Sequence, residues 1–249
     1  MKVVTVLSPS HKVFLPNYIS GFPCNPNLEL HIKFCKQVCS SSEYESEGWH
    51  EQMRIKAQTF YDELLKCPEG EGFIFSDPDI QFFGDFYDDM LKEIEGFDVV
   101  FQNDIGGGVN TGWFFARNTE SGRNLFKAIL TFIGNYSNEQ KAATDFCYNH
   151  KKYLELKDLK WKMLPIEKYW TYGVYRKTWN GKDDFDVPKE MLMHHANWTE
   201  RFDLKFDILE LVKKKYCDLH NILGYKGYVY EGEPVINCPY IPENLKIHE

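Results

Sequence analysis

Two aspartates, Asp77 and Asp79, follow directly on a short apolar stretch and flank a single proline. The apolar stretch, residues 72–76, is typical of a buried strand, so the carboxylates are expected where the chain leaves the core. Two carboxylates held this close repel each other, and a divalent cation relieves the repulsion. Mn²⁺ and Mg²⁺ prefer oxygen ligands and bridge them to phosphates. A plain β-turn with two solvated aspartates has the same pattern, which leaves both interpretations open.

Two adjacent histidines, His194 and His195, end a second apolar stretch that begins at residue 191. A single histidine in a strand is usually a core residue with satisfied hydrogen bonds. A histidine at the strand end that meets Asp79 would instead complete a metal site lined by oxygen and nitrogen. Imidazole suits borderline metals, so such a site favours Mn²⁺ over Mg²⁺. The spacing leaves open which histidine is the ligand.

An Asn-Thr-Gly step, residues 110–112, leads into a strongly apolar stretch after three consecutive glycines. The glycines allow close backbone approach or a mobile loop. Asn110 is a candidate for binding sugar hydroxyls, and the alternative is a plain strand entry without a ligand.

A lysine, Lys56, lies on the edge of the apolar stripe of a predicted helix, residues 49–66. The stripe has the spacing of one helical face and consists of Trp49, Met53, Phe60 and Leu64. A charged group is not buried without a partner. Lys56 therefore either extends its ammonium group to solvent or points into a cleft toward an anion.

Short apolar strands alternate with amphipathic helices along the chain. Strands are predicted at residues 3–7, 28–38, 72–76, 97–102, 113–116, 161–164 and 191–194, and helices at 49–66, 85–95, 118–133, 137–150 and 204–217. Residues 16–26 are rich in Pro, Gly and Asn and are predicted to form a loop. The alternation predicts one α/β domain with a mostly parallel sheet, whose ligands bind at the carboxyl ends of the strands.

Composition excludes several classes of function. The net charge of −8 argues against nucleic acid and anionic membranes as partners. No stretch approaches the ~20 apolar residues of a membrane span. The seven cysteines are odd in number and dispersed, which favours reduced thiols and a cytoplasmic protein. A luminal location is expected only if an anchor precedes this chain. A glycan on the Asn197 sequon would block the predicted site, which also argues against the secretory lumen.

Taken in order, these features resemble the nucleotide-diphospho-sugar transferases of the GT-A fold, the family that includes plant xylosyl- and arabinosyltransferases. That family has a lysine-bearing helix, an apolar strand ending in the Asp-x-Asp (DxD) motif, an Asn-Ser/Thr-Gly entry, an acidic-Gln step and a late His-x-Asn. All five occur here in that order, from about residue 50 to residue 200. The resemblance implies a GT-A (Rossmann-like) domain over residues 1–224, with a mostly parallel central sheet flanked by helices. Residues 225–249 are expected to form an irregular tail packed on it.

The resemblance also assigns roles to individual residues. It implies that Asp79 binds the metal directly, that Asp77 binds the metal or the ribose, and that His195 completes the shell, with His194 as the alternative. Residues 169–173 resemble a substrate-side loop. Residues implied for donor binding are Ser8, Pro9, Lys56, Asp77, Gly112, Arg201 and Lys205, and residues implied for catalysis or the acceptor are Asn110, Glu139, Gln140 and Asp145. Glu139 stands where the family usually has aspartate.

The implied reaction transfers a sugar from a nucleotide-diphosphate sugar, with UDP favoured over GDP, to a hydroxyl of a glycan or glycoprotein. The metal ion, with Lys56 or Lys205, would stabilise the leaving diphosphate. Glu139 or Asp145 would orient the acceptor or act as base. Retention of configuration is favoured over inversion.

Two other functions compete with this interpretation. A sugar nucleotidyltransferase would carry a glycine-rich basic loop after the first strand, and residues 7–12 contain no glycine. A non-catalytic sugar-nucleotide-binding protein could keep a degenerate transferase fold, but the intact set of motifs argues against it.

Overall fold

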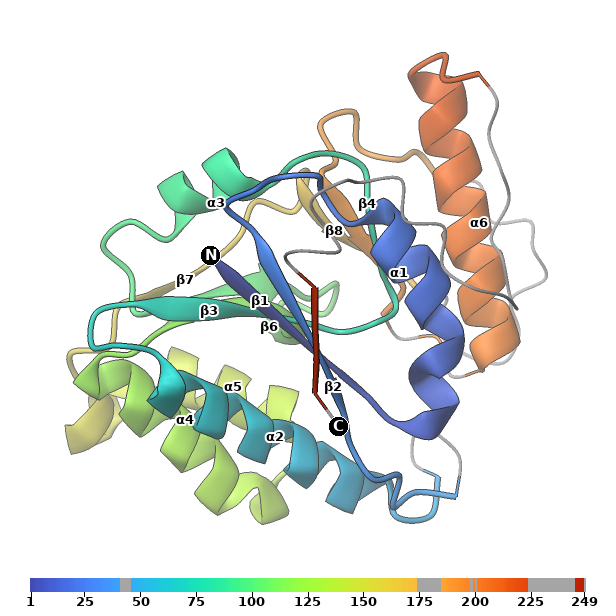
Figure 1. Ribbon diagram of the computed structural model, residues 1–249. Coiled ribbons are helices and arrows are strands. Elements are labelled where there is room, and N and C mark those ends of the chain that lie inside the picture. Colours follow the sequence, from blue (N-terminus) through green and yellow to red (C-terminus); the bar gives the residue numbers. More distant parts are fainter. Residues whose placement is uncertain (41–45, 174–184, 198, 200, 224–244, 249) are drawn as a thin grey trace.

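A seven-stranded sheet forms the centre of the molecule (Figure 1). The computed structural model describes residues 1–40, 46–173, 185–197, 199, 201–223 and 245–248. In these residues the strand order is β10-β2-β1-β3-β6-β5-β7, and only β6 runs antiparallel to its neighbours. The strands are β1 (Lys2–Leu7), β2 (Glu29–Phe34), β3 (Gly72–Ser76), β5 (Val99–Asn103), β6 (Val109–Arg117), β7 (Trp161–Met163) and β10 (Leu245–His248). The predicted mostly parallel α/β fold is therefore confirmed.

A smaller sheet of three strands carries the second half of the site. Its order is β4-β9-β8, with β4 antiparallel and β8 parallel to β9. The strands are β4 (Ile80–Phe82), β8 (Tyr169–Thr171) and β9 (Met193–His195). Since β4 follows β3 after a short turn, the turn from residue 77 to 79 connects the two sheets.

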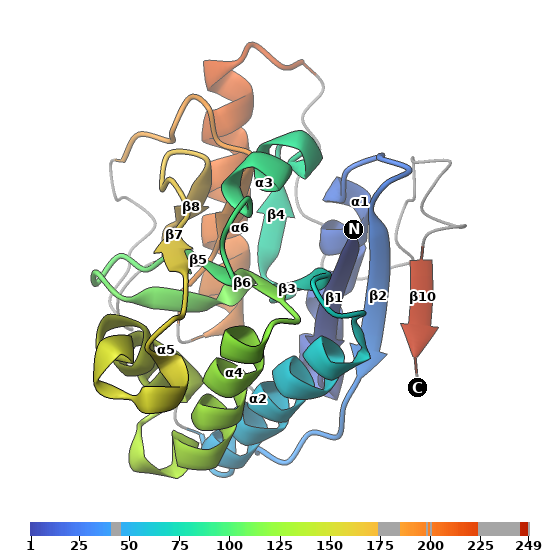
Figure 2. The ribbon, with the colours of Figure 1, turned by 90° about the vertical axis from the view of Figure 1, so that its left-hand side faces the viewer.

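Helices cover both faces of the central sheet (Figures 1 and 2). Helices α2, α4 and α5 lie together on one face, where they pack on Phe75, Phe101 and Phe114. Helices α1, α3 and α6 lie on the other side with the small sheet. Their bounds are α1 (Leu15–Gly21), α2 (Trp49–Lys66), α3 (Tyr87–Glu93), α4 (Glu120–Phe132), α5 (Glu139–Tyr148) and α6 (Phe202–Leu219).

Local sequence explains where several helices begin. The Thr119 hydroxyl accepts a hydrogen bond from the Gly122 N–H, and the Asn138 side chain accepts one from the Lys141 N–H. Both are N-caps that satisfy an N–H group at a helix start. The second cap fixes the beginning of α5 beside the predicted acidic-Gln step at residues 139–140.

An irregularity in β6 brings polar residues toward the site. Phe101 of β5 pairs with Phe114, but the next residue, Gln102, pairs with Asn110. Residues 111–113 are thus extra residues of β6 relative to β5. Bulges of this kind bend a strand and redirect its side chains. The bulge explains why a polar Asn-Thr-Gly step occurs within an otherwise apolar strand.

Three sequence-based expectations are wrong for the residues that the structure describes. Residues 16–21, inside the predicted loop, belong to α1, which has a proline in its first turn. Such a proline is compatible with a helix because the first N–H groups have no intrahelical partner. Residues 245–248, inside the predicted irregular tail, form β10 beside β2, whereas residues 225–244 and 249 lie outside the described residues. Cys24 forms a disulfide bond rather than a reduced thiol.

The remaining described cysteines, at positions 35, 39, 67, 147 and 217, are free thiols. Among the described helices, none combines the length and the apolar composition needed to cross a bilayer.

Candidate active site

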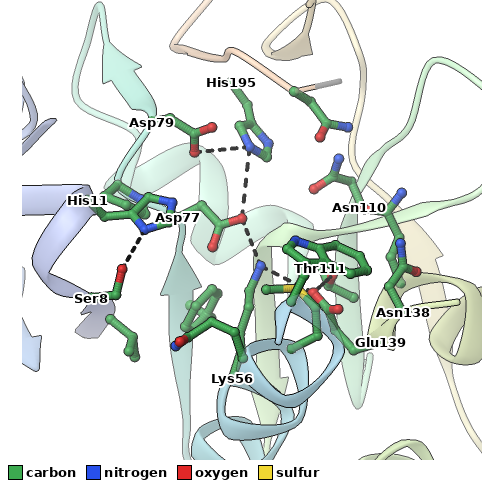
Figure 3. A pocket seen from close by; sticks show the side chains of 18 of the residues that line it. Ser8, His11, Lys56, Asp77, Asp79, Asn110, Thr111, Asn138, Glu139 and His195 are labelled. Atoms are coloured by element: carbon green, nitrogen blue, oxygen red, sulfur yellow. Dashed lines mark hydrogen bonds and ion pairs between the residues drawn. The ribbon is translucent and has the colours of Figure 1, made fainter. Parts of the chain in front are cut away.

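Two carboxylates and one imidazole meet where β3 and β9 end and β4 begins (Figure 3). The antiparallel pairing of β4 with β9 sets Ile80 opposite His195, next to Asp79. His195 Nε2 lies 3.3 Å from Asp79 Oδ1 and 3.9 Å from Asp77 Oδ2. One potential ligand atom from each of the three residues lies within 4.8 Å of the other two. Asp79 and His195 are buried, and Asp77 is half-buried.

This donor set fits a divalent metal ion. Two carboxylates supply hard oxygen ligands and an imidazole supplies a nitrogen, which suits Mn²⁺ and related ions. The predicted metal residues Asp77, Asp79 and His195 are therefore brought together at one point of the molecule.

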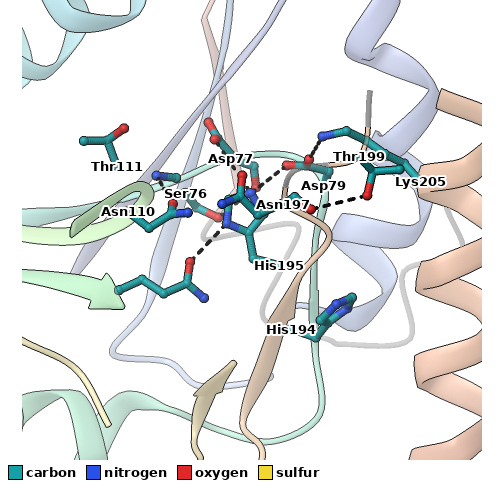
Figure 4. Close-up of polar contacts among 12 residues, drawn as sticks. Ser76, Asp77, Asp79, Asn110, Thr111, His194, His195, Asn197, Thr199 and Lys205 are labelled. Atoms are coloured by element: carbon teal, nitrogen blue, oxygen red, sulfur yellow. Dashed lines mark hydrogen bonds and ion pairs between the residues drawn. The ribbon is translucent and has the colours of Figure 1, made fainter. Parts of the chain in front are cut away.

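Two lysines approach the aspartates from opposite sides. Lys56 Nζ lies 2.8 Å from Asp77 Oδ2 and 3.3 Å from Glu139 Oε1. Lys205, in the first turn of α6, forms an ion pair with Asp79 Oδ2 (Figure 4). Lys56 thus points into the site, and of the two interpretations of this residue the one with a cleft-facing ammonium group agrees with the structure.

Burial and charge act in opposite directions on these groups. Burial disfavours the ionised Asp79 carboxylate, but Lys205 and His195 outweigh it and hold the pKa of Asp79 well below its usual range. Burial also disfavours a charged Lys56, yet the carboxylates of Asp77 and Glu139 raise its pKa above the ordinary value. Both groups are therefore ionised at neutral pH.

The two adjacent histidines of β9 have different surroundings. His195 Nδ1 lies 3.0 Å from Gln102 Oε1, and its Nε2 faces the aspartates. His194 points away from the cluster (Figure 4), with Nδ1 2.9 Å from Gln81 Nε2 and Nε2 2.8 Å from the Tyr172 carbonyl. Burial lowers the pKa of His194 to about 3. Both ring nitrogens of His194 are occupied by these protein groups, so His195 is the histidine available to a metal.

The bulge of β6 and the start of α5 supply buried polar atoms to the site. Asn110 Oδ1 accepts a hydrogen bond of 2.7 Å from the Gly112 N–H, and Glu139 Oε1 accepts one of 3.1 Å from the Thr111 hydroxyl. Asn110 Nδ2 and Glu139 Oε2 are buried and have no hydrogen-bond partner among the described residues. Buried polar groups are nearly always hydrogen-bonded, so this donor and this acceptor are expected to bind a ligand or water.

Gly112 has a steric reason to be glycine. A Cβ at this position would lie 2.2 Å from His195 Cε1 and 2.7 Å from Asp77 Oδ2. Such distances are far inside van der Waals contact, so any side chain would displace two of the three metal-site residues.

The three metal-site residues, both lysines, Asn110 and Glu139 line one cavity of about 290 Å³, whereas Gly112 and His194 are not among its lining residues. Predicted residues lining it are Ser8, Lys56, Asp77, Asp79, Asn110, Glu139, Gln140, His195 and Lys205. Residues that were not predicted from the sequence but also line it include His11, Trp49, Gln52, Thr111, Asn197 and Thr199.

Several predicted residues lie elsewhere. Asp145 accepts hydrogen bonds from the Tyr136 hydroxyl at 2.6 Å and the Asn149 amide at 2.8 Å and does not line the cavity. This distinguishes the two acids left open above, because of the two only Glu139 lines the cavity.

Arg201 pairs with Asp203 at the surface, and Pro9 is exposed at the start of a 3₁₀ helix. In the predicted substrate-side loop, residues 169–171 form β8, and none of residues 169–173 is among the cavity-lining residues.

Two residues missed from the sequence organise the site. Asp104 accepts hydrogen bonds from Gln140 at 3.1 Å and Asn197 at 2.9 Å, and so joins the β5–β6 loop to α5 and to the end of β9. His11 Nδ1 lies 2.9 Å from the Ser8 hydroxyl, and burial lowers the His11 pKa to about 4. The position of His11 just after the first strand was a usable signal, because ligands bind at carboxyl ends of parallel strands.

Comparisons with known proteins show the family and the fold of this chain. A family model described as nucleotide-diphospho-sugar transferase matches residues 26–209. A glycosyltransferase involved in glycosylation of the major capsid of PBCV-1 is similar in structure, with a TM-score of 0.54 and 11% identity over 82% of this chain and 96% of that one. The apo form of the glycosyltransferase GlyE of Streptococcus pneumoniae TIGR4 has a TM-score of 0.51 and 14% identity, covering 88% of this chain and 62% of GlyE. The chain thus spans less than two thirds of GlyE. No curated protein matches the sequence significantly.

Proposed function

The chain belongs to the nucleotide-diphospho-sugar transferase family, and from this premise we propose that it transfers a sugar from a nucleotide-diphosphate sugar to an acceptor hydroxyl with the help of a divalent metal ion. The observation that carries the proposal is the cluster of Asp77, Asp79 and His195 in a cavity that also holds Lys56 and Lys205. We propose Mn²⁺ as the ion and a UDP-sugar as the donor, with a GDP-sugar as the second choice.

The charge balance of the site supports a divalent cation as the companion of the proposed diphosphate donor. Asp77, Asp79 and Glu139 oppose only two lysines among the cavity-lining residues, which leaves a local excess of negative charge. A diphosphate would be repelled by this excess unless a cation accompanied it. Asp77, Asp79 and His195 would hold the ion, which when bound neutralises the charge that develops on the leaving diphosphate.

The lysines have separate tasks in this proposal. Lys205 contacts Asp79 from α6, and Lys56 contacts Asp77 from α2, so the two ammonium groups flank the proposed metal site. Each can hydrogen-bond a phosphate oxygen with one of its remaining protons while it keeps its aspartate in place. They therefore orient the diphosphate and add positive charge where the bond to the sugar breaks.

The sugar is proposed to lie against Asn110 and Glu139. Asn110 Nδ2 offers a donor and Glu139 Oε2 an acceptor, and both lack a partner among the described residues. A sugar hydroxyl both donates and accepts, so the pair suits a polyol. Glu139 is proposed to orient the acceptor hydroxyl of a glycan or glycoprotein, in a reaction that retains configuration.

A panel of UDP- and GDP-sugars, each with and without Mn²⁺, tests the proposal by thermal unfolding. A ligand that binds only the native state raises stability by about 2.7 kcal/mol at a hundredfold excess over its dissociation constant. We expect one donor to stabilise the protein, only with metal, and to be hydrolysed slowly. NMR of the anomeric proton of the product then reports retention or inversion.

The outcomes separate the competing functions. Metal-dependent binding without hydrolysis or transfer, across all donors and a set of acceptors, would favour a sugar-nucleotide-binding protein. Release of pyrophosphate from a nucleoside triphosphate and a sugar phosphate would favour a nucleotidyltransferase. Failure of every donor to bind would contradict the proposal.

A further inference from the structure

Gln102 makes three contacts at the end of β5, and the side chain is completely buried. Its Oε1 lies 3.0 Å from His195 Nδ1. Its Nε2 donates hydrogen bonds to the carbonyl oxygens of Tyr169 at 3.2 Å and Trp170 at 3.3 Å, both in β8. The side-chain amide is thus held between β8 and the imidazole.

The two carbonyl oxygens fix the orientation of the amide. Carbonyl oxygens only accept hydrogen bonds, so they require the NH₂ group of Gln102 on their side. The opposite orientation would set Oε1 against two other oxygens in a buried site. The amide oxygen must therefore face His195, and because this oxygen only accepts, His195 Nδ1 must carry the proton.

A neutral imidazole protonated at Nδ1 has its lone pair at Nε2. Nε2 is the atom that lies 3.3 Å from Asp79 Oδ1 and faces the proposed metal site. We propose that Gln102 is a positioning residue that holds His195 in the tautomer able to bind a metal ion. The metal ion rests on the proposed function, whereas the tautomer rests on the hydrogen bonds of Gln102 alone. Groups that orient a ligating histidine in this way typically change metal affinity about 10–100-fold when removed.

The neighbouring histidine has its own glutamine, which is bound the other way round. Gln81 Nε2 donates to the Leu209 carbonyl at 3.0 Å and lies 2.9 Å from His194 Nδ1, so an NH₂ group faces the ring. His194 Nδ1 must then accept, and Nε2 donates its proton to the Tyr172 carbonyl. Two adjacent histidines on one strand are therefore assigned opposite tautomers by two buried glutamines.

The backbone explains how Gln102 reaches the imidazole. The pairing of β5 with β6 is displaced between Phe101 and Gln102, at the bulge that also projects Asn110 and Gly112 into the site. The same irregularity that shapes the cavity wall therefore positions the residue that orients His195.

The tautomers can be measured without metal or substrate. Long-range ¹H–¹⁵N NMR of the metal-free protein, with peaks assigned by His194→Gln and His195→Gln variants, distinguishes imidazoles protonated at Nδ1 from those protonated at Nε2. We expect His195 to be protonated at Nδ1 and His194 at Nε2. A neutral His195 that carries its proton only at Nε2 would overturn the inference, whatever the activity of the protein, whereas a doubly protonated ring still keeps the Nδ1 proton that Gln102 accepts.

Metal affinity provides the second arm, with Mn²⁺ followed by electron paramagnetic resonance of the free ion. Gln102→Met should weaken Mn²⁺ binding about 10–100-fold. Gln81→Met removes the matched amide beside His194 and should change it less than about threefold. Both methionine variants lose an amide of the same size from a buried site, so the comparison isolates the contact with His195.

The Mn²⁺ affinities of the two methionine variants decide whether Gln102 positions His195. Equal losses in Gln102→Met and Gln81→Met, or no loss in Gln102→Met, would overturn the positioning role. If Gln102→Met does not fold, the NMR arm on the unmodified protein decides, and a neutral His195 with its proton only at Nε2 would overturn the inference. If the unmodified protein does not bind Mn²⁺, the proposed metal dependence fails, and the NMR arm alone decides the inference about Gln102.

Discussion

Helix α2 contributes to two buried clusters of acids and lysines, seven residues apart on the same face. In one, Glu63 accepts hydrogen bonds from Lys2 at 2.5 Å, from Lys66 at 2.7 Å and from Lys33. In the other, Lys56 lies between Asp77 and Glu139 beside Asp79 and His195. Both clusters are built from the same residue types, and both are largely shielded from solvent.

The two clusters differ in the sign of their net charge and in whether every buried polar atom has a hydrogen-bond partner. Three lysines surround the single carboxylate of Glu63, and this cluster ties α2 to β1 and β2. Three carboxylates outnumber two lysines around the cavity, where Asn110 and Glu139 each have a buried polar atom without a partner among the described residues. Burial and ion pairs alone therefore do not mark a functional site, whereas unpaired polar atoms and an excess of negative charge beside a cavity do.

The largest effect is expected from Asp79→Asn, which tests whether the cavity cluster serves chemistry. Loss of a metal ligand should remove several kcal/mol of transition-state stabilisation and lower the transfer rate by about 10³-fold or more. The rate with the best donor, measured at saturating Mn²⁺, checks this. Circular dichroism should show an unchanged fold, and full activity in the variant would show that the metal site is assigned wrongly.

The next largest effect is expected from Gly112→Ala. The added methyl group would overlap His195 and Asp77 and displace the metal ligands. Misplacement of this size costs on the order of 100-fold in rate. Gly134→Ala is the matched control, because a Cβ at Gly134 meets nothing within 4 Å. Equal activities of the two alanine variants would show that the site tolerates a shift of its ligands.

Glu63→Gln should have the opposite effect to the two variants of the active site: the protein should lose stability but keep its activity. Burial raises the pKa of this carboxyl, but the hydrogen bonds from Lys2, Lys33 and Lys66 outweigh it and lower the pKa from 4.5 to about 2. A shift of this size corresponds to roughly 3 kcal/mol of stability. We expect a comparable drop in the free energy of unfolding by urea, with kcat and KM unchanged.

The same carboxylate gives a signed pH dependence. Because its pKa is lowered on folding, its stabilising contribution is complete above pH 4.5 and is lost as the pH falls toward 2. Urea unfolding between pH 2 and pH 6 should therefore show a steeper loss of stability in the unmodified protein than in Glu63→Gln. Parallel curves would mean that Glu63 has an ordinary pKa.

The smallest effect is expected from Lys66→Met. The Lys66 side chain is 59% exposed, so its ion pair with Glu63 is screened by water. Exposed pairs contribute about 0.2–1 kcal/mol. Urea unfolding should show a loss in this range and activity should not change. A loss as large as that of Glu63→Gln would mean that the cluster acts as a unit rather than through Lys2 and Lys33.

Local patterns in the sequence predicted much of the fold. The periodic apolar stripe gave α2 its bounds, and the apolar run before Asp77 gave those of β3. Helix α1 was missed because its proline and asparagine are typical of loops, although a proline in the first turn is compatible with a helix. Strand β10 was missed because its pairing with β2 joins residues more than 200 positions apart.

The candidate site was predictable where a motif ends a strand. Asp77, Asp79 and His195 are each at such an end, and they meet. Asp104 and Gln102 were not predicted, because their roles depend on side-chain contacts between segments distant in sequence. The choice between Glu139 and Asp145 stayed open in the sequence because it depends on contacts across the fold: Glu139 lines the cavity, whereas the Asp145 carboxylate binds Tyr136 and Asn149.

The bulge in β6 also bears on how such a site can diversify. Residues 111–113 are inserted relative to β5, and of these only Trp113 pairs with β3, so Thr111 and Gly112 have no register partner in either neighbouring strand. Thr111 can therefore be exchanged without shifting the apolar residues that follow it out of register, while Gly112 stays fixed by the groups around it. A change at Thr111 would cost the hydrogen bond to Glu139 but not the strand register, whereas a side chain at Gly112 would displace two residues of the metal site. A library randomised at residue 111 would be a natural starting point for altering donor preference.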